Sequence, residues 1–280
     1  NTHMRIIAEL CQNHNGDLKL LEEMIKAASE SCDIVKIQTI LADSLAQREE
    51  YEDFRPYEPE HKRLKGLELS EEDEKFFIDK CREYGVEPMT TLFSKKQIER
   101  FNRLGYKKLK LSGYSIPAFD YGKGLEGVEF EELFFSTSSL TFSEMRRTKI
   151  NLDRLGIKYT MLQCTCKYPT KFEDAQLHNI AFLKSTMKLD SIGYSDHSNP
   201  WEDGLKVPKI AIFNGADVLE RHFTILGIDD TRDGKVSINA AMAKELKEFS
   251  LKIPFQQYLS LNKFDSEEEF NHKFYRGRFI

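Results

Sequence analysis

The sequence has no long apolar run and no excess of basic residues. No apolar stretch approaches the roughly 20 residues that a membrane-spanning helix requires, so no membrane partner is expected. Lysine and arginine together number 41 against 46 aspartates and glutamates, which gives a net charge of −5. A chain without a basic surplus lacks the electrostatic footprint of a nucleic-acid-binding protein, so no nucleic-acid partner is expected either.

Cysteine is scarce, and its count is odd. Five cysteines in 280 residues do not form the even, closely spaced set of a disulfide framework. We therefore expect a reducing, cytoplasmic location, since no secretory signal is evident. Cys164 and Cys166 alternate on an expected strand, so they should point to opposite faces and make a poor chelating pair. Residues 1–4 resemble a cloning remnant and carry no weight here.

No linker and no break in composition divides the chain, so one domain is expected. Eight strand-like segments alternate with helical segments between residues 5 and 253. The expected strands are 5–10, 34–39, 87–93, 107–113, 133–138, 158–165, 192–196 and 218–223. Eight such units favour a closed (β/α)8 TIM barrel, with residues 254–280 as an extension packed on it. The alternative is an open doubly wound sheet, but the glycine-rich turn that usually follows its first strand is absent.

Two segments between the strands carry further expectations. Asp17 is expected to cap a helix over 18–31, whose apolar residues recur at helical spacing. Residues 40–69 are irregular and rich in charge, which predicts a long loop. That loop is either a lid over the second strand or a solvated surface excursion.

Two successive expected strands end in histidine, at His197 and His222. Working residues of a (β/α)8 barrel lie at the C-terminal ends of its strands, and imidazole is the commonest metal ligand. The pair therefore indicates a shared metal site. The alternative is two unrelated histidines, one of them hydrogen-bonded in the core. Asp196, beside His197, is expected to point into the barrel wall as support.

Lys36 and Lys110 lie inside expected strands, where barrels usually carry aliphatic side chains. A buried ammonium is costly unless it meets an anion. With nearby serine and threonine hydroxyls, the two lysines indicate a pocket for a small phosphorylated or carboxylated substrate. The alternative is a structural network in which they pair with Glu9 and Glu220.

Five segments together carry a family resemblance, in order from the first expected strand to the eighth. They are IAELCQNHNG at 7–16, VKIQT at 35–39, CTCKYPT at 164–170 followed by FED at 172–174, GYSDH at 193–197, and GA at 215–216 with ERHFT at 220–224. This set resembles the sialic acid synthase family over nearly the whole barrel.

The resemblance implies that phosphoenolpyruvate condenses with the open-chain aldehyde of an N-acetylhexosamine-type sugar, giving a nonulosonic acid and phosphate. It implies a divalent metal, typically manganese, held by His197 and His222, with Glu9 orienting metal-bound water or the aldehyde. Tyr168 would line the sugar site. The substrate-binding set would be Lys36, Gln38, Ser94, Lys110, Ser136, Tyr168 and Ser195. Family members are commonly homodimers.

Three departures from the family pattern stand out. The Lys-x-Gly-Ser-Gly-Glu pattern at the fourth strand is replaced by KLSGYS at 110–115, without its carboxylate. No C-terminal antifreeze-like domain is expected, because the chain ends at Ile280, and this removes one reason for dimerisation. Cys11 stands where the family commonly has glycine.

Cys11 suggests a different metal. The related metal-dependent 3-deoxy-octulosonate 8-phosphate synthases have a cysteine after the first strand and an acidic residue after the eighth, and Cys11 and Asp233 occupy comparable places. The hypothesis is a site of four ligands, Cys11, His197, His222 and Asp233, in which a thiolate would favour iron, zinc or cobalt. The alternative is a buried, inert Cys11.

Three other functions stay open on the sequence alone. One is an octulosonate-phosphate type synthase. A second is an aldolase on another sugar, which could act through a Schiff base at Lys36 or Lys110. A third is a non-catalytic sugar-binding homologue, which the loss of the fourth-strand carboxylate would allow.

Overall fold

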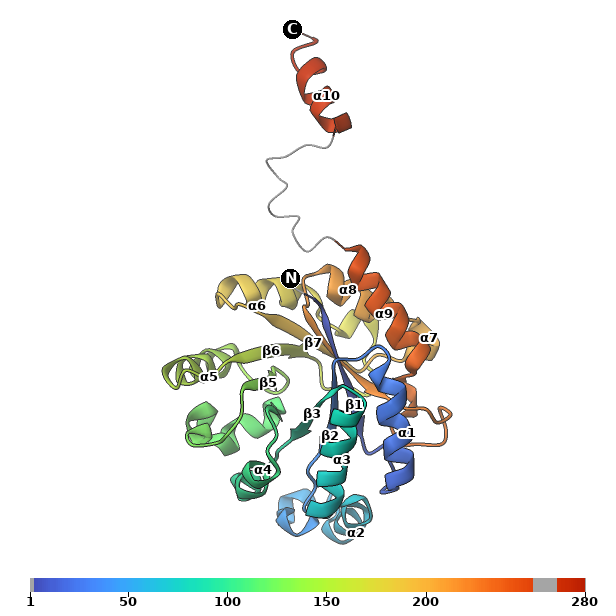
Figure 1. The fold of residues 1–280 in the computed structure, drawn as a ribbon. Coiled ribbons are helices and arrows are strands. Elements are labelled where there is room, and N and C mark those ends of the chain that lie inside the picture. The colour runs from blue at the N-terminus through green and yellow to red at the C-terminus, as the bar shows by residue number, and fades with distance from the viewer. Residues whose placement is uncertain (1–2, 254–265, 280) are drawn as a thin grey trace.

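The computed structural model describes residues 3–253 and 266–279, and within them eight parallel strands close into a barrel (Figure 1). The strands are β1 Arg5–Cys11, β2 Ile34–Gln38, β3 Glu87–Thr91, β4 Lys108–Leu111, β5 Glu132–Ser136, β6 Tyr159–Cys164, β7 Ile192–Asp196 and β8 Val218–Phe223. Each pairs with the next, and β1 also pairs with β8 in parallel, from Arg5–Val218 to Glu9–His222. This closure confirms the expected TIM barrel and excludes the open sheet.

Helices connect the successive strands and surround the barrel (Figure 1). The α-helices are α1 Leu18–Ser29, α2 Tyr57–Leu67, α3 Glu71–Glu83, α4 Ile98–Leu104, α5 Phe142–Arg154, α6 His178–Thr186, α7 Pro200–Asp203, α8 Lys206–Phe213, α9 Ala240–Lys252 and α10 Ser266–Phe274. The 3-10 helices are η1 Ala42–Ser44, η2 Glu49–Tyr51, η3 Lys95–Gln97, η4 Gly113–Leu125, η5 Phe172–Asp174 and η6 Gly234–Val236.

Helix α1 shows how local sequence produces these elements. Asp17 caps it as expected, because its carboxylate accepts the backbone N–H groups of Lys19 and Leu20. The buried side chains of α1 lie at helical spacing, and they form its face toward the barrel. They are Leu21, Met24, Ile25 and Ala28. The apolar period therefore decides which face of the helix packs on the sheet.

The inside of the barrel is filled in layers, because alternate side chains of each strand point inward. The middle layer is a separate buried apolar cluster. Its members are Ile7, Ile34, Met89, Phe134, Leu162 and Val218. Two residues further along β1, β2 and β8 stand Glu9, Lys36 and Glu220, all buried. This apolar layer thus separates a polar chamber at the C-terminal rim from the other end of the barrel.

Several segments differ from the sequence-based expectations. Residues 40–69 are not a plain loop, since they contain η1, η2 and the eleven-residue α2. No residue of α2 is fully buried, so this helix lacks the apolar stripe from which a helix is recognised. The short strand β9, Ser237–Ile238, pairs with β8 and was not among the eight expected strands.

The expected C-terminal extension is described only in part. Residues 254–265 and 280 lie outside the described residues, and 266–274 form α10, which has no buried residue. Its packing on the barrel stays a prediction. None of the helices in the described ranges combines the length and apolar character needed to cross a membrane.

Candidate active site

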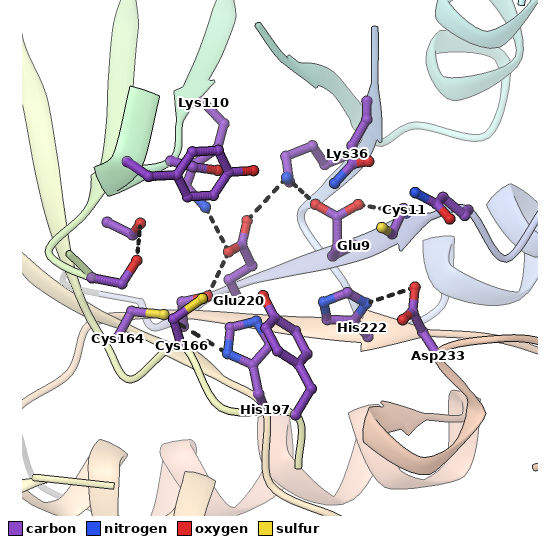
Figure 2. Close-up of a pocket in the computed structure, with 18 of the residues that line it drawn as sticks. Glu9, Cys11, Lys36, Lys110, Cys164, Cys166, His197, Glu220, His222 and Asp233 are labelled. Carbon is purple, nitrogen blue, oxygen red and sulfur yellow. Dashed lines mark hydrogen bonds and ion pairs between the residues drawn. The ribbon is translucent and has the colours of Figure 1, made fainter. Parts of the chain in front are cut away.

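A cavity of about 500 Å³ opens where the barrel strands end, and Figure 2 shows the charged and sulfur-bearing side chains that converge on it. All but one of the residues predicted for the site line it. These are Glu9, Cys11, Lys36, Gln38, Lys110, Ser136, Tyr168, Ser195, His197, His222 and Asp233. The exception is Ser94, which lines the adjoining cavity; its hydroxyl is buried and has no hydrogen-bond partner.

Two lysines and two glutamates form the floor of the cavity. Lys36 pairs with Glu9 on the neighbouring strand, and its Nζ lies 3.5 Å from Oε2 of Glu220. Lys110 Nζ lies 2.7 Å from Oε1 of Glu220, which also accepts the hydroxyl of Ser195 at 2.7 Å. These are the ion pairs that the sequence offered as the alternative to an anion pocket. The two interpretations are compatible, since both lysines also face the cavity.

The charges of this floor are mutually stabilised. Burial lowers the pKa of Lys36, but the carboxylates of Glu9 and Glu220 outweigh burial and leave that pKa raised. Burial raises the pKa of Glu220, yet Lys110 and Lys36 more than offset it and hold the pKa below its usual range. Both groups are therefore ionised near neutral pH. A buried cluster of this kind is favourable only while every member keeps its partner.

His197, His222 and Tyr168 form an aromatic corner beside the floor. The ring centroids of the two histidines are 5.3 Å apart, and Tyr168 lies 4.3 Å from His197. Burial lowers the pKa of His197 to about 4, and burial with the neighbouring His197 lowers the pKa of His222 well below its usual value. Both rings are neutral near pH 7, which is the form that binds metals.

Cys11, His222 and Asp233 form the group that could hold a metal ion. One ligand atom from each lies within 4.8 Å of the others. The Nδ1 atom of His222 is buried without a hydrogen-bond partner, and it lies 3.7 Å from Oδ2 of Asp233. An imidazole nitrogen without a hydrogen-bond partner, close to a thiol and a carboxylate, is suited to bind a cation. Within the described ranges, the fourth predicted ligand, His197, stands next to this group but is not part of it.

Asp196 does not line the cavity and lies in the barrel wall, as expected. It is fully buried, forms an ion pair with Arg221, and accepts the backbone N–H of Ser198 at 2.8 Å. Arg221 in turn donates to the carbonyl groups of Ser198 and Val236, both at 3.1 Å. This network joins the end of β7, the loop that follows it and the connection after β8, close to His197 and His222.

The expectation for Cys164 and Cys166 is wrong. Strand β6 ends at Cys164, so alternation no longer governs Cys166, and both side chains line the same cavity (Figure 2). Cys164 Sγ lies 3.7 Å from Nδ1 of His197. The two thiols therefore belong to one wall of the site rather than to opposite faces of a strand.

The segment after β4, which departs from the family pattern, makes a close turn at Gly113. A Cβ on Gly113 would lie 1.9 Å from the carbonyl oxygen of Ser138, so only glycine fits there. The N–H of Gly113 donates to the hydroxyl of Ser136 at 2.8 Å. This close approach puts Tyr114 over the cavity, while Ser115, which stands at the position of the absent carboxylate, is buried and does not line it.

Sequence reasoning missed the residues around the mouth of the cavity. They are Arg55, Arg63, Tyr114, Ser138 and Arg232. The three arginines lie in irregular segments or in the unexpected helix α2, where neither period nor spacing ties a side chain to the barrel. The interpretation of 40–69 as a lid was the one signal that pointed to Arg55 and Arg63.

Comparison with known proteins shows which proteins this chain is similar to. Residues 24–254 match the model of the NeuB family. The chain is 34% identical, over 79% of its length, to the N,N'-diacetyllegionaminic acid synthase of Legionella pneumophila, and it spans 64% of that relative. It is 30% identical, over 86% of its length and 73% of the relative's, to the enzyme of the same name from Campylobacter jejuni.

A solved structure supports the fold independently of close sequence similarity. The N-acetylneuraminic acid (sialic acid) synthetase of Leptospira borgpetersenii, in complex with citrate, superposes with a TM-score of 0.83 at 22% identity. The match covers 98% of this chain and 93% of that one. The family model matches well over half of the chain, and four of the five segments that carry the resemblance lie within the matched residues 24–254, so the chain belongs to the NeuB family.

Proposed function

We propose that this protein condenses phosphoenolpyruvate with the open-chain aldehyde of an N-acetylhexosamine-type sugar. The carbon–carbon bond would form between C3 of phosphoenolpyruvate and the aldehyde carbon. One water is consumed, and a nonulosonic acid and inorganic phosphate are released. The observation that carries the proposal is the juxtaposition of two cavity-facing lysines, Lys36 and Lys110, with a Cys–His–Asp metal-type group at one barrel rim.

Phosphoenolpyruvate offers a phosphate and a carboxylate, and the floor of the cavity offers matching groups. Lys36 and Lys110 supply two buried ammonium donors, and Ser136 and Ser195 line the same cavity with their hydroxyl-bearing side chains. Charge-assisted hydrogen bonds in a buried site are stronger than neutral ones. Glu220 holds both lysines in place, because each of its oxygens faces one ammonium group.

Cys11, His222 and Asp233 would hold the divalent cation, with His197 beside them. A cation bound there acts as a Lewis acid that polarises and orients the sugar aldehyde. The thiol of Cys11 favours iron, zinc or cobalt over manganese, because soft ligands select softer metals. Tyr168 would lie against the sugar, and Glu9 would orient the aldehyde or water from its place between Lys36 and Cys11.

The aldolase alternative with its Schiff base at Lys36 is disfavoured by the charge state of that lysine. A Schiff-base lysine must lose its proton to act as a nucleophile. The raised pKa of Lys36, caused by Glu9 and Glu220 against the opposing effect of burial, keeps it protonated.

A homodimer is the assembly we expect.

The test is release of phosphate from phosphoenolpyruvate with a panel of N-acetylated hexosamines and of pentose and hexose phosphates. Metal-loaded protein should release phosphate with at least one N-acetylhexosamine, in equal amount to a new nonulosonic acid found by mass spectrometry. Trapping of a sugar on the protein by borohydride, without phosphate release, would establish the aldolase instead. Release only with a simple pentose phosphate would favour the octulosonate-phosphate type reaction.

A further inference from the structure

An apolar groove of about 330 Å³ lies beside the connection between β8 and β9. It is separate from the active-site cavity, because the two share no lining residue. Trp201 of α7 and Ile225 are 52% and 41% exposed in it, and Leu226, Ile228 and Ile238 complete its apolar lining. An exposed apolar hollow of this kind is a place where another segment can pack.

The stretches of chain that line this groove carry more carboxylates than cations. Four exposed carboxylates come directly after lining residues, Glu202 and Asp203 in α7, and Asp229 and Asp230 in the β8–β9 connection. None of the four forms an ion pair with another residue of the described ranges. The exposed cations of the same connection are Lys235 and Arg232, and Arg232 lines the active-site cavity instead. The groove therefore favours a partner that is both apolar and basic.

Residues 270–279, in α10 and directly after it, have this character. Ring centroids of Phe270 and Phe274 are 4.7 Å apart, and those of Phe270 and Tyr275 are 6.3 Å apart, so the aromatic side chains form one cluster. With Phe279, these side chains are 54–87% exposed, and no residue of α10 is buried. The stretch contains no carboxylate, although the chain as a whole has a net charge of −5. Its cations are Lys273, Arg276 and Arg278.

Charge distinguishes this groove from another apolar hollow at the surface. That hollow lies between α5 and α6, and Phe142 and Ile150 line it. Its charged lining residues are all basic, namely Arg146, Lys149 and Lys188. A basic segment is repelled there, whereas the carboxylates beside Trp201 attract it.

The length of the chain allows residues 270–279 to reach the groove within one molecule. Asn239 lines the groove and caps α9, which runs from Ala240 to Lys252. At 1.5 Å per residue, α9 carries the chain about 20 Å away from the groove. Residues 253–265 can span about 40 Å when extended, so the chain between α9 and α10 is long enough to return.

We propose that residues 270–279 dock into the groove beside Trp201 of the same molecule. Their aromatic side chains would pack on its apolar lining, and their cations would face the flanking carboxylates. This gives the expected packing of the C-terminal extension on the barrel a defined site, and it does not depend on the proposed function. The β8–β9 connection also carries Asp233 of the metal-type group, so docking would hold that connection in place.

Trp201 is the one tryptophan of the chain, so its fluorescence reports directly on the groove. In the wild type, Trp201 should be shielded from quenching by acrylamide, and the Phe270→Ser/Phe274→Ser variant should lose this shielding. Lys273→Glu/Arg276→Glu should lose it too, and adding Asp229→Lys/Asp230→Lys should restore it. Amide hydrogen exchange of residues 224–236 should become faster by roughly 10-fold in the two variants that expose Trp201, because undocking frees the connection.

Phe182→Ser is the matched control. Phe182 is 53% exposed on α6 and lines neither the groove nor the basic hollow, so quenching of Trp201 should stay at the wild-type level. Equal quenching in the wild type and in Phe270→Ser/Phe274→Ser would overturn the proposal, as would a combined charge reversal that does not restore shielding. Shielding that disappears when the wild type is diluted would also overturn it, because a second copy would then fill the groove.

Discussion

Cys11 has a backbone conformation that is unusual for a residue with a side chain. Its backbone has φ of +46°, in the left-handed region that favours glycine, and a register shift interrupts the β1–β2 pairing between Glu9 and Cys11. Glycine, which the family resemblance places at this position, suits this conformation. A side chain costs about 1–2 kcal/mol at such a position. Strain of this size, kept next to His222 and Asp233, supports a role for the thiol.

We therefore expect Cys11→Ser to change which metal the protein holds. The purified variant should contain less iron, zinc or cobalt, and its affinity for zinc should fall by at least roughly 10-fold, as for the loss of a soft ligand. Metal analysis and a zinc titration measure both quantities. The cobalt-loaded wild type should also show a thiolate-to-metal absorption band that the variant lacks.

Cys166→Ser is the control for this prediction, because Cys166 lines the same cavity but is not in the metal-type group. Its metal content and cobalt spectrum should match those of the wild type. Unchanged metal content and affinity in Cys11→Ser would instead mean that Cys11 is a buried, inert thiol.

At the scale of elements, the parts that alternate regularly were the predictable ones. Lys36 and Gln38 share a face of β2 because strand side chains alternate, and both line the cavity. Strand ends were less certain, and a shift of a single residue at the end of β6 reversed the inference for Cys166. Arg55, Arg63 and Arg232 could not be found from period or spacing, since tertiary contacts alone bring them to the barrel.

Helix α5 shows how strongly a local signal can determine an element. Thr141 accepts the N–H of Glu144 at 3.1 Å, and Glu144 accepts the N–H of Thr141 at 2.9 Å, so the two form a capping box. The helix packs against η4, the segment that carries Tyr114 over the cavity, and Tyr121 of η4 donates to Glu144 at 3.0 Å. The cap therefore helps to place a wall of the site.

Thr141→Ala should lower the free energy of unfolding by about 1 kcal/mol, the usual value of an N-cap side chain. The midpoint of urea unfolding, followed by circular dichroism, measures the change. Ser143→Ala is the matched control, since Ser143 lies exposed in the same turn without a capping role, and its effect should stay within about 0.5 kcal/mol. A loss as large in Ser143→Ala as in Thr141→Ala would contradict the argument.

At the scale of the whole molecule, the barrel carries a polar layer at each end of an apolar one. The layer opposite the active site centres on Glu132 of β5, which is fully buried. Arg5 of β1 donates to both of its oxygens, at 2.7 and 2.9 Å, and Lys108 of β4 donates at 3.0 Å. This cluster joins strands that are far apart around the barrel, so it contributes to closure as a whole rather than to one element.

The same cluster should make stability depend on pH. Burial raises the pKa of Glu132, but the hydrogen bonds and charges of Arg5 and Lys108 outweigh it and lower the pKa from 4.5 to about 2. A carboxyl group whose pKa is lower in the folded state stabilises that state above its unfolded pKa of 4.5. Its contribution falls as the pH drops from about 4.5 toward 2, because the unfolded chain then binds the proton more readily.

Glu132→Gln should therefore lower the free energy of unfolding by roughly 3 kcal/mol at pH 7, since it leaves Arg5 and Lys108 without their charge partner. The difference from the wild type should shrink steadily between pH 4.5 and pH 2, as measured by urea unfolding at several pH values. Glu131→Gln provides the control, because Glu131 is 64% exposed and lies 3.8 Å from Lys107 at the surface. That variant should differ little from the wild type at any pH, because exposed ion pairs contribute at most about 1 kcal/mol. A Glu132→Gln difference independent of pH would mean that shape rather than charge makes Glu132 important to the barrel.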